Sequence, residues 1–487
     1  MLKRYLPEVR ASLLLAYPVM LSQLGHVLMG FTDNIMVGHI NSTSLAAAGL
    51  ANVAFNVLLL FGIGVSYAIT PLVAAADGGR NVTAIADTLK HGLVINVINA
   101  FVLVALVLLA QQLLYHIGQP PEVIDLAIPY LDIITWSLIP ALIFQTFRQF
   151  SEGLSHTWVP MAVVLLANVL NVALNYLLIY GYEGIPALGL PGAGYATLIS
   201  RVFMAVALAS YIFRARLFRA YRAGFEMSNY SIALFRKMLK IGLPDGLQFI
   251  FEVAAFDFSL VMMGWLGTTA LAAHQIAINL ATISYMTISG IAAAATIRVG
   301  YFLGKRDYAQ MRLSANVLLV LAVIFMAVCA AVFIVGRHQL PFMYVNDADV
   351  AALAASLLII AGIFQLSDGI QVVSIAALRG LQDVRVGHWL AYRVRSGFLG
   401  GHGRHRHLDR AVHRFEPHRC GCHLAVPLIF ATHASRALTF SRKSNIFVDV
   451  SRINENISFH LSAFFDWLCA FVGALRGHGK LRRRRRL

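Results

Sequence analysis

The chain has 487 residues, of which 59% are hydrophobic and only 13% are charged, and its mean hydropathy is +0.71. Soluble domains average about 25% charged residues, so this composition excludes a string of ordinary globular domains, and the many aliphatic residues exclude a disordered chain. The net charge of +16 belongs to the end of the chain, because residues 1–386 hold 21 Lys and Arg against 18 Asp and Glu, whereas residues 387–487 hold 18 against 5.

Long apolar runs separated by short polar breaks recur ten times in the first 386 residues. They cover approximately 11–38, 45–75, 90–114, 126–150, 157–180, 191–213, 238–264, 270–300, 312–336 and 350–380. Most exceed the roughly 20 residues that cross a bilayer as a helix, and the weak alternating pattern of barrel strands is absent. The sequence therefore predicts an all-α polytopic membrane protein. We expect the first run to remain in the protein, because Met1–Arg10 does not have the layout of a signal peptide.

The distribution of Lys and Arg between the loops predicts the orientation. With the N-terminus inside, cytoplasmic segments hold 19 of the 21 cations of residues 1–386, including seven in the linker at 214–240. Arg337 is the only cation of an outer loop, and Arg201 lies within the sixth run. Because cytoplasmic loops are enriched in Lys and Arg, we expect the N-terminus in the cytoplasm. We also expect the protein in the bacterial inner membrane.

The two halves of the chain resemble each other at a constant offset. Starting from Pro18 and Pro244, where we expect helix bends, an offset of 226 aligns residues 36–47 with 262–273, with six identities in twelve positions. Near the end of the fourth run, Gly153 aligns with Gly380 at an offset of 227. Since six runs precede the second copy, both copies enter the membrane in the same direction. The sequence predicts two parallel six-helix repeats.

The repeat also predicts two helices over roughly 387–440, and the sequence there does not fit them. It is dense in His and Arg, which a bilayer rejects. Our hypothesis is that residues after about 386 are read in a shifted frame, so that the second repeat lacks its last two helices and the chain is unstable and inactive as a pump. The expected domains are a bundle at 1–213, a cytoplasmic linker at 214–237, an incomplete bundle at 238–386 and an aberrant basic tail at 387–487.

Few ionisable side chains fall inside the apolar runs, and each is a functional candidate because a charge in lipid is costly. Asp33 lies in the first run, Glu252 in the seventh and Asp368 in the tenth. In the fifth run, Asn171 and Asn175 lie one helical turn apart on one face. A structural alternative stays open for all five, since buried polar side chains also join neighbouring helices by hydrogen bonds.

Carboxyl groups near the middle of a bilayer indicate ion exchange. Desolvation disfavours the bare charge, so that a proton or a metal cation neutralises it. If a lipophilic cation competes for the same carboxyl, one ion expels the other without ATP, and the chain contains no GxxxxGK[ST] phosphate-binding loop. We therefore expect a transporter and not an enzyme, with a proton or a metal cation as coupling ion at Glu252, Asp368 and Asp33 and no other cofactor or metal.

Several separated segments occur in a characteristic order over residues 8–386. They are Pro18, Gly30-Phe31-Thr32-Asp33, Met36-Val37-Gly38, Leu45-Ala46-Ala47, Leu170-Asn171-Val172-Ala173-Leu174-Asn175, Glu252, Phe364-Gln365-Leu366-Ser367-Asp368-Gly369 and Ala377-Leu378-Arg379-Gly380. Together they resemble the multidrug and toxic compound extrusion (MATE) transporters, most closely the NorM branch. The resemblance implies a monomeric twelve-helix antiporter that exports small cationic drugs or dyes in exchange for Na⁺ or H⁺, with coupling carboxylates in the first, seventh and tenth helices.

Three alternatives stay open. A lipid-linked oligosaccharide flippase shares the architecture, although such proteins line their cavity with cations and only Arg201 lies well inside a run here. The tail could be a metal-binding or nucleic-acid module, given Cys420-Gly421-Cys422-His423 and Arg482–Arg486, but a zinc site needs a second pair of ligands at a defined spacing. The third alternative is a non-functional truncated transporter. We expect no nucleic-acid partner.

Overall fold

The computed structural model describes residues 2–116, 120–182, 184, 186–222 and 229–382. The α-helices are α1 Leu2–Gly38, α2 Ser42–Ser66, α3 Ile69–Gly78, α4 Val82–Ala110, α5 Pro121–Trp136, α6 Leu138–Gly153, α7 Trp158–Tyr180, α8 Leu190–Arg214, α9 Arg219–Arg222, α10 Ile232–Trp265, α11 Thr268–Lys305, α12 Tyr308–Val335 and α13 Ala348–Gly380. Four short 3₁₀ helices, Gln111–His116, Arg216–Phe218, Gly336–His338 and Leu340–Met343, complete the described part. The expected missing helices and basic tail concern residues after 382, which lie outside it.

Among the described residues, ten helical segments are long and apolar enough to cross a membrane, and they confirm the ten expected runs. Two of them are interrupted. The segment Ser42–Gly78 divides into α2 and α3 at Tyr67, and the segment Pro121–Gly153 divides into α5 and α6 at Ser137. Both breaks have the same cause, because Pro71 and Pro140 each follow the break and a proline ring clashes with the carbonyl group four residues earlier.

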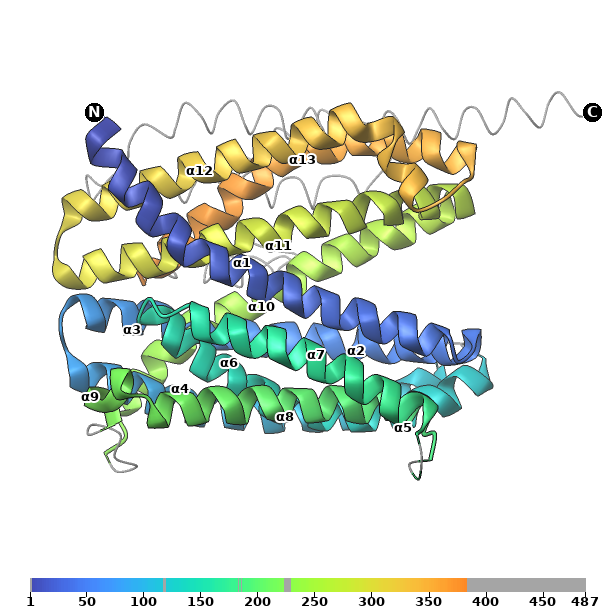
Figure 1. The fold of residues 1–487 in the computed structure, drawn as a ribbon, viewed down its shortest axis with the longest axis horizontal. Helices are drawn as coiled ribbons and strands as arrows, with labels where there is room; N and C mark the ends of the chain where they lie inside the picture. Colours follow the sequence, from blue (N-terminus) through green and yellow to red (C-terminus); the bar gives the residue numbers. More distant parts are fainter. Residues whose placement is uncertain (1, 117–119, 183, 185, 223–228, 383–487) are drawn as a thin grey trace, which may run out of the picture. The chain divides into compact units, whose positions relative to one another are not determined.

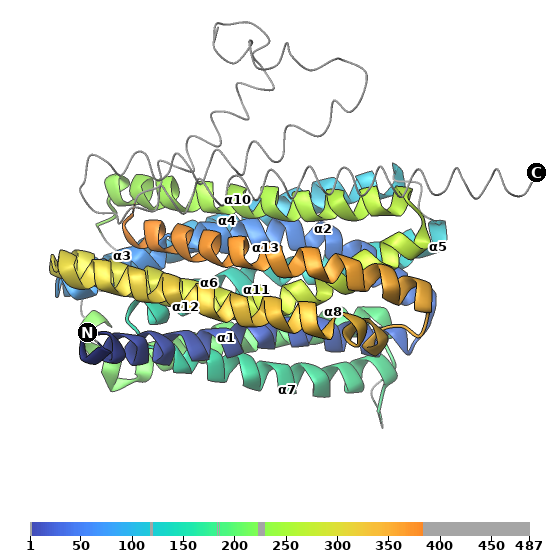
Figure 2. The same cartoon turned by 90° about the horizontal axis from the view of Figure 1, so that it is seen from above.

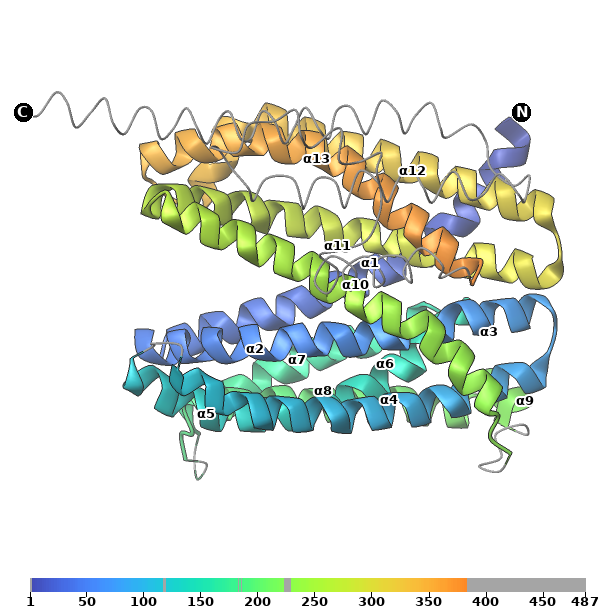
Figure 3. The same cartoon turned by 180° about the vertical axis from the view of Figure 1, so that it is seen from behind.

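The described helices form two groups, joined by two helices that run between them (Figure 1). We call α2–α8 the first bundle, α11–α13 the second bundle, and α1 and α10 the crossing helices. Helix α1 packs against α7 of the first bundle and α11 of the second, and α10 packs against α2 and α11. Figure 2 shows α1 lying between α7 and α12, and Figure 3 shows α10 running from the first bundle to the second.

Close backbone approaches hold the crossing helices. Helix α10 crosses α2 where Gly246 meets Gly64, and α1 crosses α11 where Met20 meets Gly290. Each residue of the first pair is related to one of the second by the 226-residue offset. A Cβ atom on Gly64 would overlap the backbone of Gly246, which explains the glycine at this crossing. Both crossings are therefore copies of one contact.

The direct contact between the two bundles is symmetric as well. Helix α3 lies on α11 so closely that a Cβ atom on Gly78 would overlap the carbonyl oxygen of Tyr301, and one on Gly304 would overlap that of Ala75. The offset of 226 exchanges the two contacts, as in an isologous interface, where the same surface is used twice. The parallel internal repeat is thus confirmed in three dimensions.

The turns before α4 and α12 have the same local geometry. Asn81 caps α4 and Asp307 caps α12, each accepting a hydrogen bond from the backbone N–H three residues later, at 3.0 Å and 3.1 Å. The residues before them, Arg80 and Arg306, are both left-handed, with φ of 56° and 59°. The helix-ending glycine predicted to repeat, Gly153 and its counterpart at 380, packs against a valine of α3 or α11 in both halves.

The crossing helix α10 is buried only along its first half. Its buried residues are Met238, Ile241, Gly242, Asp245 and Gly246. Met238 and Ile241 belong to the hydrophobic core of the first bundle, whereas a separate core joins α11, α12 and α13. The second half of α10 therefore keeps its polar side chains accessible, which matters for the site described next.

Candidate functional site

Three of the expected residues meet in the first bundle. Asp33 of α1 is 8% exposed. Its Oδ1 accepts a hydrogen bond from Asn175 Nδ2 at 2.5 Å, and its Oδ2 accepts one from Thr197 Oγ1 at 3.0 Å. The same Asn175 amide donates to Asn171 Oδ1 at 3.2 Å. We call these four residues the Asp33 site, and both oxygens of its carboxyl are occupied.

A cation lies close to the Asp33 site. Arg201 is one turn from Thr197 on α8, donates a hydrogen bond to Ser137 Oγ at 2.6 Å, and stacks on the ring of Phe55 at 4.8 Å. Its charge acts on Asp33. The sequence showed Arg201 inside a membrane span but gave no partner for it. The carboxyl of this site therefore has a counter-charge supplied by the protein.

The Asp33 site also holds polar atoms without partners. Among the described residues, Asn171 Nδ2 donates no hydrogen bond and Asn175 Oδ1 accepts none, and both atoms are buried. An amide oxygen beside a carboxylate suits a hard cation such as Na⁺, and the carboxylate alone suits a proton. The residues present therefore fit a small coupling cation.

Glu252 and Asp368 lie within electrostatic reach of each other in the second half of the chain. They lie on α10 and α13, and the charge of Asp368 acts on Glu252. One turn from each carboxyl, the rings of Phe256 and Phe364 are in edge contact at 6.5 Å. Asp368 is 9% exposed and Glu252 is half-buried. Within the described part, neither carboxyl receives a hydrogen bond or an ion pair, so this pair, the Glu252–Asp368 site, has free carboxylate oxygens.

Two further groups that the sequence analysis did not name as site residues lie near the Glu252–Asp368 site. Gln365 lies one turn from Asp368, donates to Ser284 Oγ at 2.5 Å, and leaves its own buried Oε1 without a partner. Tyr285 of α11 lies within electrostatic reach of both carboxyls. Such oxygens complete the ligand set of a hard cation. Within the described residues, no group of three or more His, Cys, Asp and Glu could hold a metal ion.

The remaining expected residues are the two prolines. Pro18 and Pro244 lie inside α1 and α10, and both helices continue through them. A proline removes one backbone hydrogen bond and weakens the helix locally. A bend at these positions stays a prediction.

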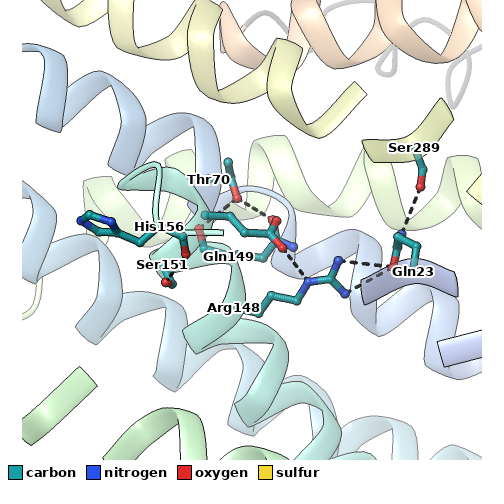
Figure 4. A network of polar contacts seen from close by, with 8 residues as sticks. Gln23, Thr70, Arg148, Gln149, Ser151, His156 and Ser289 are labelled. Atoms are coloured by element: carbon teal, nitrogen blue, oxygen red, sulfur yellow. Dashed lines mark hydrogen bonds and ion pairs between the residues drawn. The ribbon is translucent and has the colours of Figure 1, made fainter. Parts of the chain in front are cut away.

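A polar network joins the first bundle to α1 and α11 (Figure 4). Arg148 pairs with Glu152 on its own helix, Nε to Oε1 at 2.7 Å, and both of its terminal nitrogens donate to Gln23 Oε1 of α1 at 3.3 Å. Gln23 in turn donates to Ser289 Oγ of α11 at 3.4 Å. The buried arginine is thus fully compensated and does not contribute a free positive charge.

Sequence comparisons identify relatives along most of the described chain. The profile of the MatE family matches residues 18–177 and 244–391. A probable multidrug resistance protein NorM of Rhizobium meliloti is 35% identical over 382 residues, which cover 77% of this chain and 82% of the relative. A protein with the same description from Rhodopseudomonas palustris is 36% identical over 383 residues, covering 78% and 81%.

Solved structures share the fold. The eukaryotic MATE transporter AtDTX14 superposes with a TM-score of 0.70 at 19% identity, covering 79% of this chain and 86% of that one. A transporter of the MOP superfamily from Pyrococcus furiosus, described as having a binding pocket of reverse polarity that suggests a different function, superposes with a TM-score of 0.69 at 20% identity, covering 79% and 85%. Because these identities are low, the structures establish the fold alone.

Proposed function

The chain belongs to the MatE family of transporters, and from that premise we propose that it exports small cationic drugs or dyes in exchange for Na⁺ or H⁺. The relatives described as multidrug resistance proteins support drug efflux as the general activity. The exchange mechanism is supported by one observation above all: Glu252 and Asp368 lie within electrostatic reach of each other, and neither has a hydrogen bond or ion pair among the described residues.

The sign of the unpaired buried charge distinguishes a cation exporter from a flippase. The buried arginines of the described spans have acidic or polar partners, since Arg148 pairs with Glu152, Arg298 with Glu8 and Arg379 with Asp245. Arg201 lies near Asp33 and donates to Ser137 Oγ, so the charged groups of the candidate sites that lack a partner among the described residues are the carboxylates of Glu252 and Asp368. A site of this sign favours a cationic substrate, whereas a flippase for an anionic lipid-linked sugar would need free cations. The transporter from Pyrococcus furiosus shares the fold and is described as having a binding pocket of reverse polarity. The fold therefore does not fix the sign of the charge in the pocket, and this sign decides between the two functions.

In the proposed cycle, a cation entering from outside occupies the Glu252–Asp368 site and displaces the bound drug. The oxygens of Gln365 and Tyr285 would complete the coordination of Na⁺, and protonation of the carboxyls would have the same effect for H⁺. The Asp33 site would take up a coupling cation in the first bundle. We place the N-terminus and the 214–240 linker in the cytoplasm, and the monomer in the bacterial inner membrane.

Uptake of ethidium into everted membrane vesicles, driven in turn by a Na⁺ or a proton gradient, tests the proposal against the alternative of a non-functional truncated transporter, for which neither gradient would drive uptake. We expect uptake with one of the two gradients and its loss in Glu252→Gln and Asp368→Asn, which keep the side-chain shape. Asp257→Asn is the matched control, because this exposed carboxyl lies on the same helix and we expect no effect there. Undiminished uptake in both site variants would contradict the proposed coupling site.

A further inference from the structure

We propose that Asp245 is a positioning residue that binds Arg379 and thereby keeps this arginine from neutralising the Glu252–Asp368 site. The inference rests on the proposed function, because it concerns the affinity of the same site for cations. It assigns a role to an ion pair that lies outside the two candidate sites. Four observations carry it.

The first observation is the geometry of the ion pair. Arg379 Nε, near the end of α13, donates to Asp245 Oδ2 of α10 at 2.7 Å. Asp245 is 7% exposed. The guanidinium also stacks on the ring of Tyr67, 4.8 Å from its centroid, at the break between α2 and α3. Arg379 is thus held by two residues that do not belong to the carboxyl site.

The second observation is the register of the two helices. Glu252 follows Asp245 by seven residues, which places it about 10 Å further along α10 on nearly the same face. Asp368 precedes Arg379 by eleven residues, which again returns to nearly the same face of α13. Side chains of α10 and α13 meet at the Asp245–Arg379 ion pair and again at the Phe256–Phe364 ring contact, so the ion pair and the carboxyl pair are two levels along the same two helices.

The third observation is electrostatic. The charge of Arg379 acts on Glu252. It also acts on Tyr285, together with the charges of Glu252 and Asp368. Arg379 therefore lies close enough to compete with an incoming cation. Asp245 offsets the positive charge of Arg379. The ion pair is then neutral, and the Glu252–Asp368 site keeps the negative charge of its two carboxylates.

The fourth observation comes from the internal repeat. The position equivalent to Asp245 is Val19, and the positions equivalent to Glu252 and Asp368 are His26 and Ala141. In the first half, the arginine of α6 finds its acidic partner on its own helix and reaches only a neutral amide on α1. At this position of the crossing helix, an acid thus occurs only in the half that also carries Glu252 and Asp368.

The charge balance gives the size of the effect. Replacing Asp245 by Asn leaves the charge of Arg379 uncompensated at position 245, which the helical rise of seven residues places about 10 Å from Glu252. With an effective dielectric constant of about 20, a unit charge at this distance weakens the binding of a monovalent cation about tenfold. Removing both charges of the ion pair restores the original balance. A purely structural role for the pair would not produce this restoration.

The test is equilibrium binding of ethidium to the full 487-residue chain in lipid nanodiscs, followed by dye fluorescence. We expect Asp245→Asn to raise the Kd for ethidium about tenfold and the double variant Asp245→Asn/Arg379→Gln to return it to within about threefold of the parent. The matched control is Glu152→Gln, which removes the partner of another buried arginine. We expect it to leave the Kd unchanged.

The outcomes separate the inference from the function on which it rests. Loss of ethidium binding in Glu252→Gln supports the proposed site. If Asp245→Asn then binds ethidium like the parent, or if the double variant is as weak as the single one, the positioning role is wrong and the site stands. If the parent chain does not bind ethidium, or if Glu252→Gln binds it unchanged, both proposals are overturned.

Discussion

Replacing Glu8 by Ala should destabilise the protein, because Glu8 anchors the start of α1 to the second bundle. Arg298 of α11 donates to both of its carboxylate oxygens, from Nε to Oε1 at 2.9 Å and from Nη2 to Oε2. Ser314 Oγ of α12 also donates to Oε1, at 2.5 Å. Glu8 is 6% exposed, and the side chain of Arg298 is 19% exposed. Alanine would leave a largely buried guanidinium without its partner.

Breaking a buried ion pair on one side costs roughly 3–5 kcal/mol. Because Arg298 retains some exposure, we expect the lower end, a decrease of about 3 kcal/mol in the free energy of unfolding. Removing both charges in Glu8→Leu/Arg298→Met should cost much less, since no charge is then left unpaired. Equilibrium denaturation by SDS in mixed micelles, followed by circular dichroism, measures both variants. A double variant that is less stable than Glu8→Ala would refute this reasoning.

Three further predictions concern packing, hydrogen bonding and pH. Gly304→Leu should prevent the close approach of α3 and α11 and abolish drug efflux, whereas Gly264→Leu, at a glycine with open space around it, should be tolerated in the same efflux assay. Thr197→Val removes one hydrogen bond to the Asp33 carboxyl and should lower the free energy of unfolding by about 1–2 kcal/mol in SDS denaturation. The control Thr287→Val loses only a hydrogen bond within its own helix and should change this free energy by less than about 0.5 kcal/mol. Burial lowers the pKa of His156, so the unfolded chain takes up a proton below about pH 6.5 while the folded chain does not. The protein should therefore lose stability as the pH falls from 7 to 5. The loss should be smaller in the variant His156→Asn.

Hydropathy and the internal offset predicted much of the fold. The ten runs correspond to the ten membrane-length segments, because a helix in lipid must be apolar over its whole length. The sequence missed the breaks at Tyr67 and Ser137, which fall inside continuous apolar runs. Pro71 and Pro140 follow these two breaks in the sequence. Pro18 and Pro244, in contrast, lie within helices that continue, so a proline alone does not decide whether a helix is interrupted.

The candidate sites were predictable only in part. A polar residue in an apolar run is visible in the sequence, and Asp33, Asn171 and Asn175 do meet in the structure. The partners of such residues are set by the packing of distant helices and leave no local pattern. Thr197 reaches Asp33 across 164 residues and Arg379 reaches Asp245 across 134, so only the three-dimensional arrangement reveals these contacts.

The central claim is that the Glu252–Asp368 site exchanges a coupling cation for a cationic drug. Its most direct test is cation flux in proteoliposomes that contain the purified chain, with internal dyes for Na⁺ and for pH, when ethidium is added to the side from which it is exported. We predict that ethidium drives Na⁺ or H⁺ across the membrane in the opposite direction, and that Glu252→Gln abolishes this flux. Ethidium transport without any countermovement of Na⁺ or H⁺, or countermovement that persists in Glu252→Gln, would contradict it.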